Sequence, residues 1–234
     1  MFRNSFQSGF LSVFHSQGSN PLQLWSICDS ESVPITSENP ASFEAQNDDT
    51  FFSPESEQFP SNTLCFLGPT KHVSSNIMFV KDSILHSQVL RMVANDISNT
   101  FISSPPSPGL SLGIKLHIAI ILARNLDKFF SIEFEIIDHL EQSRRFRASN
   151  FQDETRVTPE ITTMNLRLDE GWNQIIFDLD FLTQKFYNSC YKETSRIILH
   201  PNTHLRRLYF ASEIVPEAQL PSELRLYTPD TSLS

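Results

Sequence analysis

The densest group of side chains capable of chemistry is a run of three arginines, Arg144, Arg145 and Arg147, with Phe146 between them. A guanidinium group presents a planar fork of donors that fits a carboxylate or a phosphate through two parallel hydrogen bonds. Successive side chains of a strand point to opposite faces, so in a strand Arg145 and Arg147 would share one face and Phe146 would take the other. The run therefore predicts a strip that can bind anions.

Further arginines fall on other expected strands or loops, and the alternation of those strands would bring several of them onto one exposed face. Two interpretations of this face stay open. The arginines are solvated and paired with local Glu and Asp, or they form a docking face for an acidic polymer. The candidate partner-binding residues are Arg144, Arg145, Arg147, Asn150, Arg156, Arg167, Arg206 and Arg207.

Other motifs that would indicate catalysis, cofactors or metals are missing. The sequence has no GxGxxG, GxxxxGK[ST] or GxSxG signature, which removes support for nucleotide-binding folds and hydrolase elbows. His200 and His204 have the spacing HxxxH, but Pro201 lies between them, so we expect ordinary turn histidines and no metal site. The three cysteines, odd in number and far apart, contain no CxxC pair and predict neither a zinc site nor a disulfide framework. We expect no enzymatic activity and no cofactor.

The elements that must position the arginines are predicted to be strands. From residue 100 onward apolar and polar residues alternate, which is typical of half-buried strands, and shorter candidate strands come before it. Only 180–187 shows near-helical spacing, with Asp178 or Asp180 able to cap it. A parallel sheet would need a crossover helix after nearly every strand, and these are missing. The expected strands are 10–14, 22–27, 77–80, 89–93, 112–123, 130–136, 164–168, 174–179, 197–199, 208–210 and 224–226.

This pattern predicts an all-β chain with a single antiparallel β-sandwich domain over 1–230, of the jelly-roll or galactose-binding-like kind, with one short helix and a tail at 231–234. Trp172 follows a turn and opens a strand whose Ile175 and Phe177 should face the core. We therefore expect Trp172 to be largely buried.

The charge of the chain is concentrated in one segment. The formal net charge is −9, and eight acids lie between Asp29 and Thr63, a stretch without Lys or Arg that is also rich in serine and proline. Such composition buries too little apolar surface to offset the entropy lost on ordering. We predict a long, disordered, mobile acidic insert over 29–76. It is either a solvated tether or a docking or phosphorylation segment.

The longest unbroken apolar run is 118–123, far short of the roughly 20 residues that a membrane span needs. The N-terminus has no apolar segment typical of a secretory signal. We expect a soluble intracellular protein that does not enter a membrane.

Several collinear blocks resemble the cilia- and flagella-associated protein 20 family. They cover about 1–27 and 77–229, nearly all of the chain outside the predicted insert. The blocks are Met1-Phe2-x-Asn4-x-Phe6-Gln7-Ser8-Gly9-Phe10-Leu11-Ser12, Pro21-Leu22-Gln23-x-Trp25, Leu112-Gly113-Ile114-Lys115-Leu116, Arg144-Arg145-Phe146-Arg147-Ala148-Ser149-Asn150, Met164-x-Leu166-Arg167-Leu168-Asp169-x-Gly171-Trp172-Asn173-Gln174-Ile175, Tyr191-x-Glu193-Thr194, Arg206-Arg207-x-Tyr209-Phe210 and Leu220-Pro221.

The resemblance implies a compact, non-enzymatic β-sandwich at the inner junction of ciliary doublet microtubules. There it would help to join the A- and B-tubules, next to a parkin co-regulated protein and other inner-junction proteins, and contribute to axoneme stability and ciliary motility. It implies the cytoplasm and cytoskeleton as the location, at the axoneme and at basal bodies and centrioles. The arginines suit this role because the tubulin surface is acidic, and contacts repeated along a lattice add up.

The chain departs from the family in one place and leaves two other functions open. Typical members carry a Lys/Arg-rich stretch shortly after the position of Trp25, where this chain has its acidic segment. One alternative is a nuclear or nucleic-acid-binding protein, but the nearly neutral domain, without a basic tail or an aromatic stacking platform, makes a nucleic-acid partner unlikely. The other is a sugar-binding sandwich module, which rests on analogy of fold alone.

Overall fold

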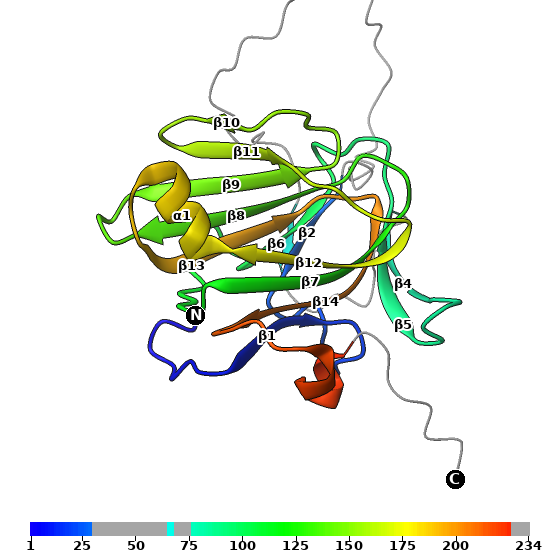
Figure 1. The fold of residues 1–234 in the computed structure, drawn as a ribbon. Coiled ribbons are helices and arrows are strands. Elements are labelled where there is room, and N and C mark those ends of the chain that lie inside the picture. The colour runs from blue at the N-terminus through cyan, green and yellow to red at the C-terminus, as the bar shows by residue number, and fades with distance from the viewer. Residues whose placement is uncertain (30–64, 68–75, 226–234) are drawn as a thin grey trace, which may run out of the picture.

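The computed structural model describes residues 1–29, 65–67 and 76–225. In these residues the chain forms two β-sheets that pack face to face, with one α-helix, so the predicted β-sandwich is confirmed (Figure 1). One pair of neighbours, β11 and β9, is parallel, and all the other paired strands are antiparallel.

The six-stranded sheet has the order β12-β7-β14-β5-β4, and β1 pairs with β14 beside this path. Its strands are β1 (Phe10–His15), β4 (Ile77–Lys81), β5 (Gln88–Met92), β7 (Ile118–Asn125), β12 (Gly171–Asp178) and β14 (Thr203–Ala211).

The eight-stranded sheet has the order β10-β11-β9-β8-β13-β6-β2-β3. Its strands are β2 (Ser26–Cys28), β3 (Cys65–Leu67), β6 (Phe101–Ser104), β8 (Ser131–Asp138), β9 (Ser143–Ser149), β10 (Arg156–Val157), β11 (Ile161–Asn165) and β13 (Tyr191–Leu199).

The core lies between the sheets and is built by the inward-facing half of each alternating strand. Phe134 of β8 contacts Phe177 of β12 and Phe210 of β14 across the sandwich, with ring centroids 5.2 Å and 6.4 Å apart. Trp25 is fully buried, packs edge-on against Phe14 and donates its indole N–H to the Val13 carbonyl oxygen at 3.0 Å. Because these aromatic rings come from distant parts of the sequence, they hold the two sheets in one arrangement.

Among the described residues the chain forms one α-helix, α1 (Leu179–Tyr187), which matches the predicted helix. The Asp178 carboxylate accepts from the Phe181 N–H at 3.0 Å, so Asp178 is the N-cap, one of the two residues expected to cap it.

The strand expected at 224–226 is wrong at its first residue, which is not in a strand. Leu224 lies in a short 3-10 helix, η2 (Ser222–Leu224), which follows η1 (Glu217–Gln219). Leu224 and Leu220 pack on the outer surface of the six-stranded sheet.

Trp172 is only partly buried, which corrects the expectation of a core tryptophan. Ile175 and Phe177 do face the core, so Trp172 lies on the opposite face of β12, the face that also carries Ile176. Its indole N–H donates to the buried Asp82 carboxylate at 3.4 Å. Alternation counted from Ile175 would have placed Trp172 correctly.

The ends of the predicted insert are fixed to the sandwich. Asp29 is buried and accepts from the Asn76 amide at 2.8 Å. Residues 65–67 form β3, which pairs with β2, so this part of the predicted insert belongs to the sheet. Cys28 is disulfide-bonded, a bridge that the number and spacing of the cysteines do not predict. The rest of the predicted insert and the 231–234 tail lie outside the described residues.

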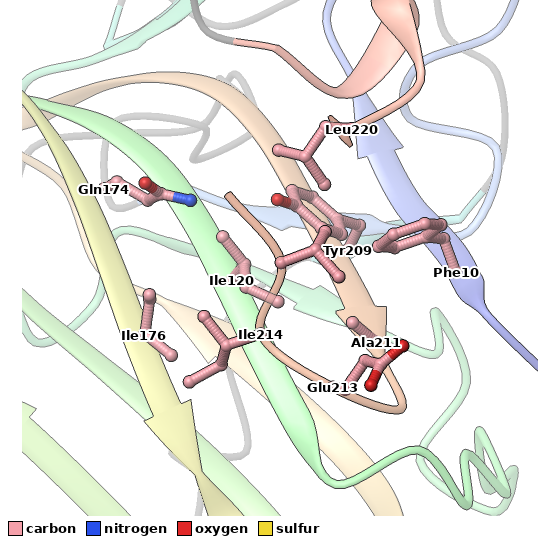
Figure 2. Close-up of a pocket in the computed structure, with 10 residues that line it drawn as sticks. Phe10, Ile120, Gln174, Ile176, Tyr209, Ala211, Glu213, Ile214 and Leu220 are labelled. Atoms are coloured by element: carbon pink, nitrogen blue, oxygen red, sulfur yellow. The ribbon is translucent and has the colours of Figure 1, made fainter. Parts of the chain in front are cut away.

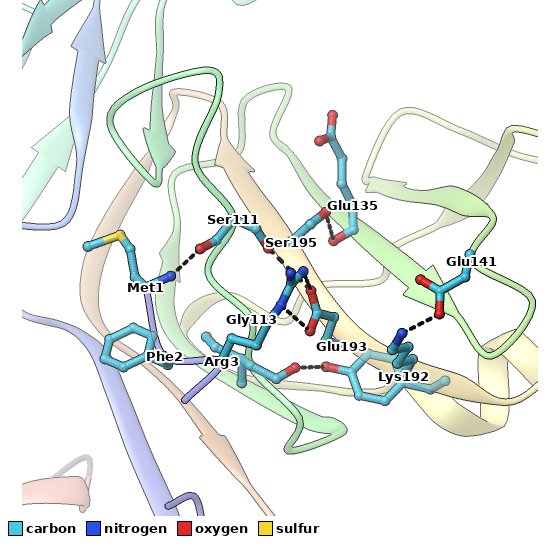
Figure 3. A network of polar contacts seen from close by, with 12 residues as sticks. Met1, Phe2, Arg3, Ser111, Gly113, Glu135, Glu141, Lys192, Glu193 and Ser195 are labelled. Carbon is cyan, nitrogen blue, oxygen red and sulfur yellow. Dashed lines mark hydrogen bonds and ion pairs between the residues drawn. The ribbon is translucent and has the colours of Figure 1, made fainter. Parts of the chain in front are cut away.

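The N-terminal segment packs against the connection that leads into β7 (Figure 3). The Phe2 N–H donates to the Leu112 carbonyl oxygen at 2.6 Å, and Arg3 donates to the buried Glu193 of β13 at 3.1 Å. Gly113 has a positive φ of 67°, and a Cβ there would lie 2.7 Å from that of Arg3. Two of the sequence blocks quoted above, at 1–12 and 112–116, are therefore in contact.

Candidate functional site

The central arginines lie on β9 as alternation predicts. Phe146 is buried in the core, whereas Arg145 and Arg147 lie on the outer face of the eight-stranded sheet. Both retain solvent contact, with 31% and 25% of the side chain exposed. Each of them therefore faces solvent with part of its donor fork.

Both arginines are paired with carboxylates of the neighbouring strand β8. Arg145 donates to Glu135 at 2.8 Å and lies 3.6 Å from Glu133, while Arg147 lies 3.5 Å from Glu133. From the other side, Arg196 of β13 lies 3.6 Å from Glu135, and His200 lies 3.0 Å from Glu133. We call these six residues the arginine–glutamate cluster; its members are Glu133, Glu135, Arg145, Arg147, Arg196 and His200.

Glu133 is the centre of the cluster, because it is buried and three cations or potential cations surround it. Burial favours the neutral carboxyl, but the hydrogen bond with His200 and the charges of Arg147 and Arg145 outweigh it and hold the pKa of Glu133 below its ordinary value. Glu133 is therefore ionised at neutral pH and fixes both arginines on the sheet surface.

Arg156 extends the same face. It pairs in register with Thr163 of β11, Thr163 pairs with Arg147, and Arg147 pairs with Glu133. Residues in register on neighbouring strands share a face, so Arg156 lies on the outer face about 10 Å from Arg147, two strand spacings away. Arg156 is exposed, and no ion pair joins it to a described residue. We call the outer face that carries Arg145, Arg147 and Arg156 the arginine face.

The remaining predicted residues of this region lie elsewhere. Arg144 points to the other side of β9, where its guanidinium stacks 4.6 Å from the centre of the Tyr187 ring and lies 3.4 Å from the buried Asp138. Asn150 accepts from the Phe130 N–H at 2.9 Å and donates to the Lys128 carbonyl oxygen at 2.8 Å, so it joins two loops. Arg167 is exposed in the connection between β11 and β12.

Arg206 and Arg207 are on β14, in the other sheet, and are both buried with 2% exposure. Arg206 donates to the Gln88 carbonyl oxygen at 3.2 Å and to Gln17 at 3.0 Å. Burial, and secondarily the charge of Arg206, lowers the pKa of Arg207 to about 10. The structure therefore does not bring these two arginines to the arginine face.

The outer surface of the six-stranded sheet carries an apolar hollow beneath residues 213–220 (Figure 2). It is shallow, with a cavity volume of about 10 Å³, room for about one water molecule. Ile120, Tyr209 and Phe10 form its floor, and Gln174 and Ile176 of β12 form one wall. No sequence motif pointed to this hollow, because its residues come from four strands and a loop.

No sequence motif identified the carboxylates of the arginine–glutamate cluster or Arg196 as site residues. Alternation along 130–136 already placed Glu133 and Glu135 on the polar face of their strand, which is the signal that could have found them.

His200 and His204 do not converge: His200 pairs with Glu133, and His204 lies 3.5 Å from Asp82. Within residues 1–29, 65–67 and 76–225, no three His, Cys, Asp or Glu side chains are grouped to hold a metal ion. No helix of this part of the chain is long and apolar enough to span a membrane.

Comparison with known proteins gives one consistent result. The CFA20 domain family model matches residues 62–228. The chain is 38% identical to cilia- and flagella-associated protein 20 of Caenorhabditis elegans, over 98% of the chain and 92% of the relative. It is 37% identical to the protein of that name from Chlamydomonas reinhardtii, over 98% of each, and 36% identical to that of Paramecium tetraurelia, over 98% and 97%.

Proposed function

Because the chain belongs to the cilia- and flagella-associated protein 20 family, we propose that it is a non-enzymatic structural protein that binds the doublet microtubules of cilia or flagella. In this role it links the A- and B-tubules at the inner junction and adds to axoneme stability and ciliary motility. Its partners are tubulin, a parkin co-regulated protein and other inner-junction proteins, and its location is the axoneme and the basal body.

The arginine face is the observation that supports this proposal. Arg145, Arg147 and Arg156 lie on one face of the eight-stranded sheet, and two of them are held in place by the buried Glu133. A rigid row of partly exposed guanidinium groups suits an acidic surface, because each arginine keeps donors that its internal partner does not use. The tubulin surface is acidic, and a lattice offers the same contact at every repeat, so modest single contacts add up.

Fractionation of cilia tests the proposal. The tagged full-length chain is expressed in ciliated cells, the membrane is removed with detergent, and the axonemes are washed with increasing salt. We expect the chain to stay with the axoneme in detergent and to be released only by high salt, because exposed charges are screened over about 8–10 Å at physiological ionic strength. Reconstruction of the labelled doublets should then place it between the tubules.

Complete release of the chain with the detergent-soluble matrix would contradict a structural role in the axoneme. Recovery in the nucleus alone would favour the nucleic-acid alternative.

A further inference from the structure

Strand β12 is an open edge of the six-stranded sheet. It ends the strand order and pairs with β7 alone. On its other side, in the part of the chain that the structure describes, the backbone groups of 172–178 hydrogen-bond to no other segment. An eight-residue strand with an unpaired row of N–H and C=O groups is a template for another extended chain.

The side chains next to this edge favour binding of a segment with apolar side chains. Ile176 points outward from β12 with 39% exposure, and Ile214 beside it is 59% exposed. Both lie at the mouth of the hollow under residues 213–220 (Figure 2). A strand added to the free edge of β12 would place every second side chain about 5 Å from those of Gln174 and Ile176, on the side of β12 away from the hollow.

Carboxylates surround the edge. Asp169 and Glu170 are exposed where β12 begins. Asp178 and Asp180 lie where it ends; Asp178 caps α1 and lies 3.2 Å from His117, and Asp180 accepts from the Tyr191 N–H at 3.0 Å. Arg167 precedes the first pair, and Arg124, which pairs in register with Trp172, is bound to Asp82. The edge therefore has acidic residues at both ends and an apolar centre. This pattern favours a bound segment with basic residues at its ends.

This charge pattern argues against other occupants. Two copies of β12 paired antiparallel would set the Asp169–Glu170 end of one copy against the Asp178–Asp180 end of the other, with like charges facing each other. The segment between Asp29 and Thr63 has eight acids and no Lys or Arg. The carboxylates at the ends of β12 would therefore repel it.

We propose that the free edge of β12 forms a docking site for an extended segment of a partner protein. The segment carries apolar side chains at alternate positions and Lys or Arg at its ends. It adds to the sheet as a further strand: backbone hydrogen bonds supply affinity, while Ile176 and the flanking carboxylates supply selectivity. This site is separate from the arginine face and does not depend on microtubule binding.

A synthetic peptide tests the site on the full chain. The probe is a fluorescent peptide of alternating valine and threonine with a pair of lysines at each end, and its binding is followed by fluorescence anisotropy at low salt. Matched probes replace the lysines by glutamates or methylate alternate backbone nitrogens. The variant Ile176→Lys places a cation on the exposed face of β12. The control Leu140→Lys changes a residue of similar character, 59% exposed, in the turn after β8.

We expect the lysine peptide to bind and the glutamate peptide to bind at least about tenfold more weakly. Methylation that blocks the strand-pairing N–H groups should remove binding. Ile176→Lys should weaken the lysine peptide by about tenfold or more, while Leu140→Lys leaves it unchanged and both variants melt like the wild type. No binding of the lysine peptide, equal binding to Ile176→Lys, or a chain that dimerises in solution through β12 would each overturn the proposal.

Discussion

At the scale of single residues, buried carboxylates set the positions of charged groups on both sheets. Glu133 holds Arg145 and Arg147 on one sheet, and Asp82 organises the other. The Asp82 carboxylate accepts from the N–H groups of Ile84 and Leu85, both at 2.9 Å, and lies 3.0 Å from Arg124. Reversing the charge of an arginine paired with Glu133 would therefore disturb the fold as well as any docking.

Asp82 gives the fold a dependence on acid pH. Burial favours its neutral form, but the hydrogen bonds from Leu85, Ile84, Arg124 and Trp172 outweigh it and lower its pKa from 3.8 to about 2. A lowered pKa in the folded state stabilises the fold above about pH 4, and this contribution is lost as the pH falls from about 4 to about 2. The loss should be roughly 1–2 kcal/mol of the free energy of unfolding.

Urea unfolding at a series of pH values, with wild type and Asp82→Asn, measures this contribution. The variant should be less stable at neutral pH, and the difference should shrink between pH 4 and pH 2, since the wild-type carboxylate becomes protonated there. A difference that does not change with pH would contradict this role of Asp82.

Gly113 supplies a second prediction, because its positive φ and its contact with Arg3 both exclude a side chain. Gly113→Ala should lower the free energy of unfolding by about 1–3 kcal/mol, since the N-terminal segment must move away or the backbone must remain strained. Gly109→Ala is the matched control: a Cβ there meets no atom within 4 Å, and its effect should stay within about 0.5 kcal/mol. Thermal melts that show the two variants to be equal would contradict the packing of the N-terminal segment.

At the scale of elements, the two tryptophans should differ. Trp25 is 1% exposed and packs on Phe14, whereas Trp172 is only partly buried on the outer face of β12. Trp25→Ala should cost roughly 3–5 kcal/mol of stability, and Trp172→Ala about half as much. Denaturant unfolding of the two variants measures this, and a larger loss for Trp172→Ala would contradict the placement of both residues.

The elements that the sequence predicted best are those with long alternation or a capped helix. The alternation around Phe134 and Ile175 and the cap of α1 at Asp178 follow from local rules, and the structure agrees. The parallel pairing of β11 with β9 and the burial of Arg206 and Arg207 depend on which distant strands meet. Local periodicity carries no information about that choice. The hollow beside β12 was missed for the same reason.

At the scale of the whole molecule, charge separates the predicted insert from the sandwich. The ends of this segment are close in space, because β3 pairs with β2 and Asn76 binds Asp29. Replacing 31–63 by a short linker should therefore leave the melting temperature and the β-rich circular dichroism unchanged. Unfolding of the shortened chain would show that the segment contributes to the core.

The proposed docking of the arginine face on microtubules can be tested at Arg156. Arg156 is exposed on that face, whereas Arg167, which is also exposed, lies in the connection that leads to β12. Co-sedimentation with microtubules compares the wild type with Arg156→Glu and Arg167→Glu across a range of salt concentrations. Binding of the wild type to microtubules should fall as the salt concentration rises. Arg156→Glu should weaken binding by about threefold or more at low salt. Its free energy of unfolding should change by less than about 1 kcal/mol. Arg167→Glu should bind like the wild type; equal binding by wild type and Arg156→Glu, or binding that salt does not change, would contradict docking through the arginine face.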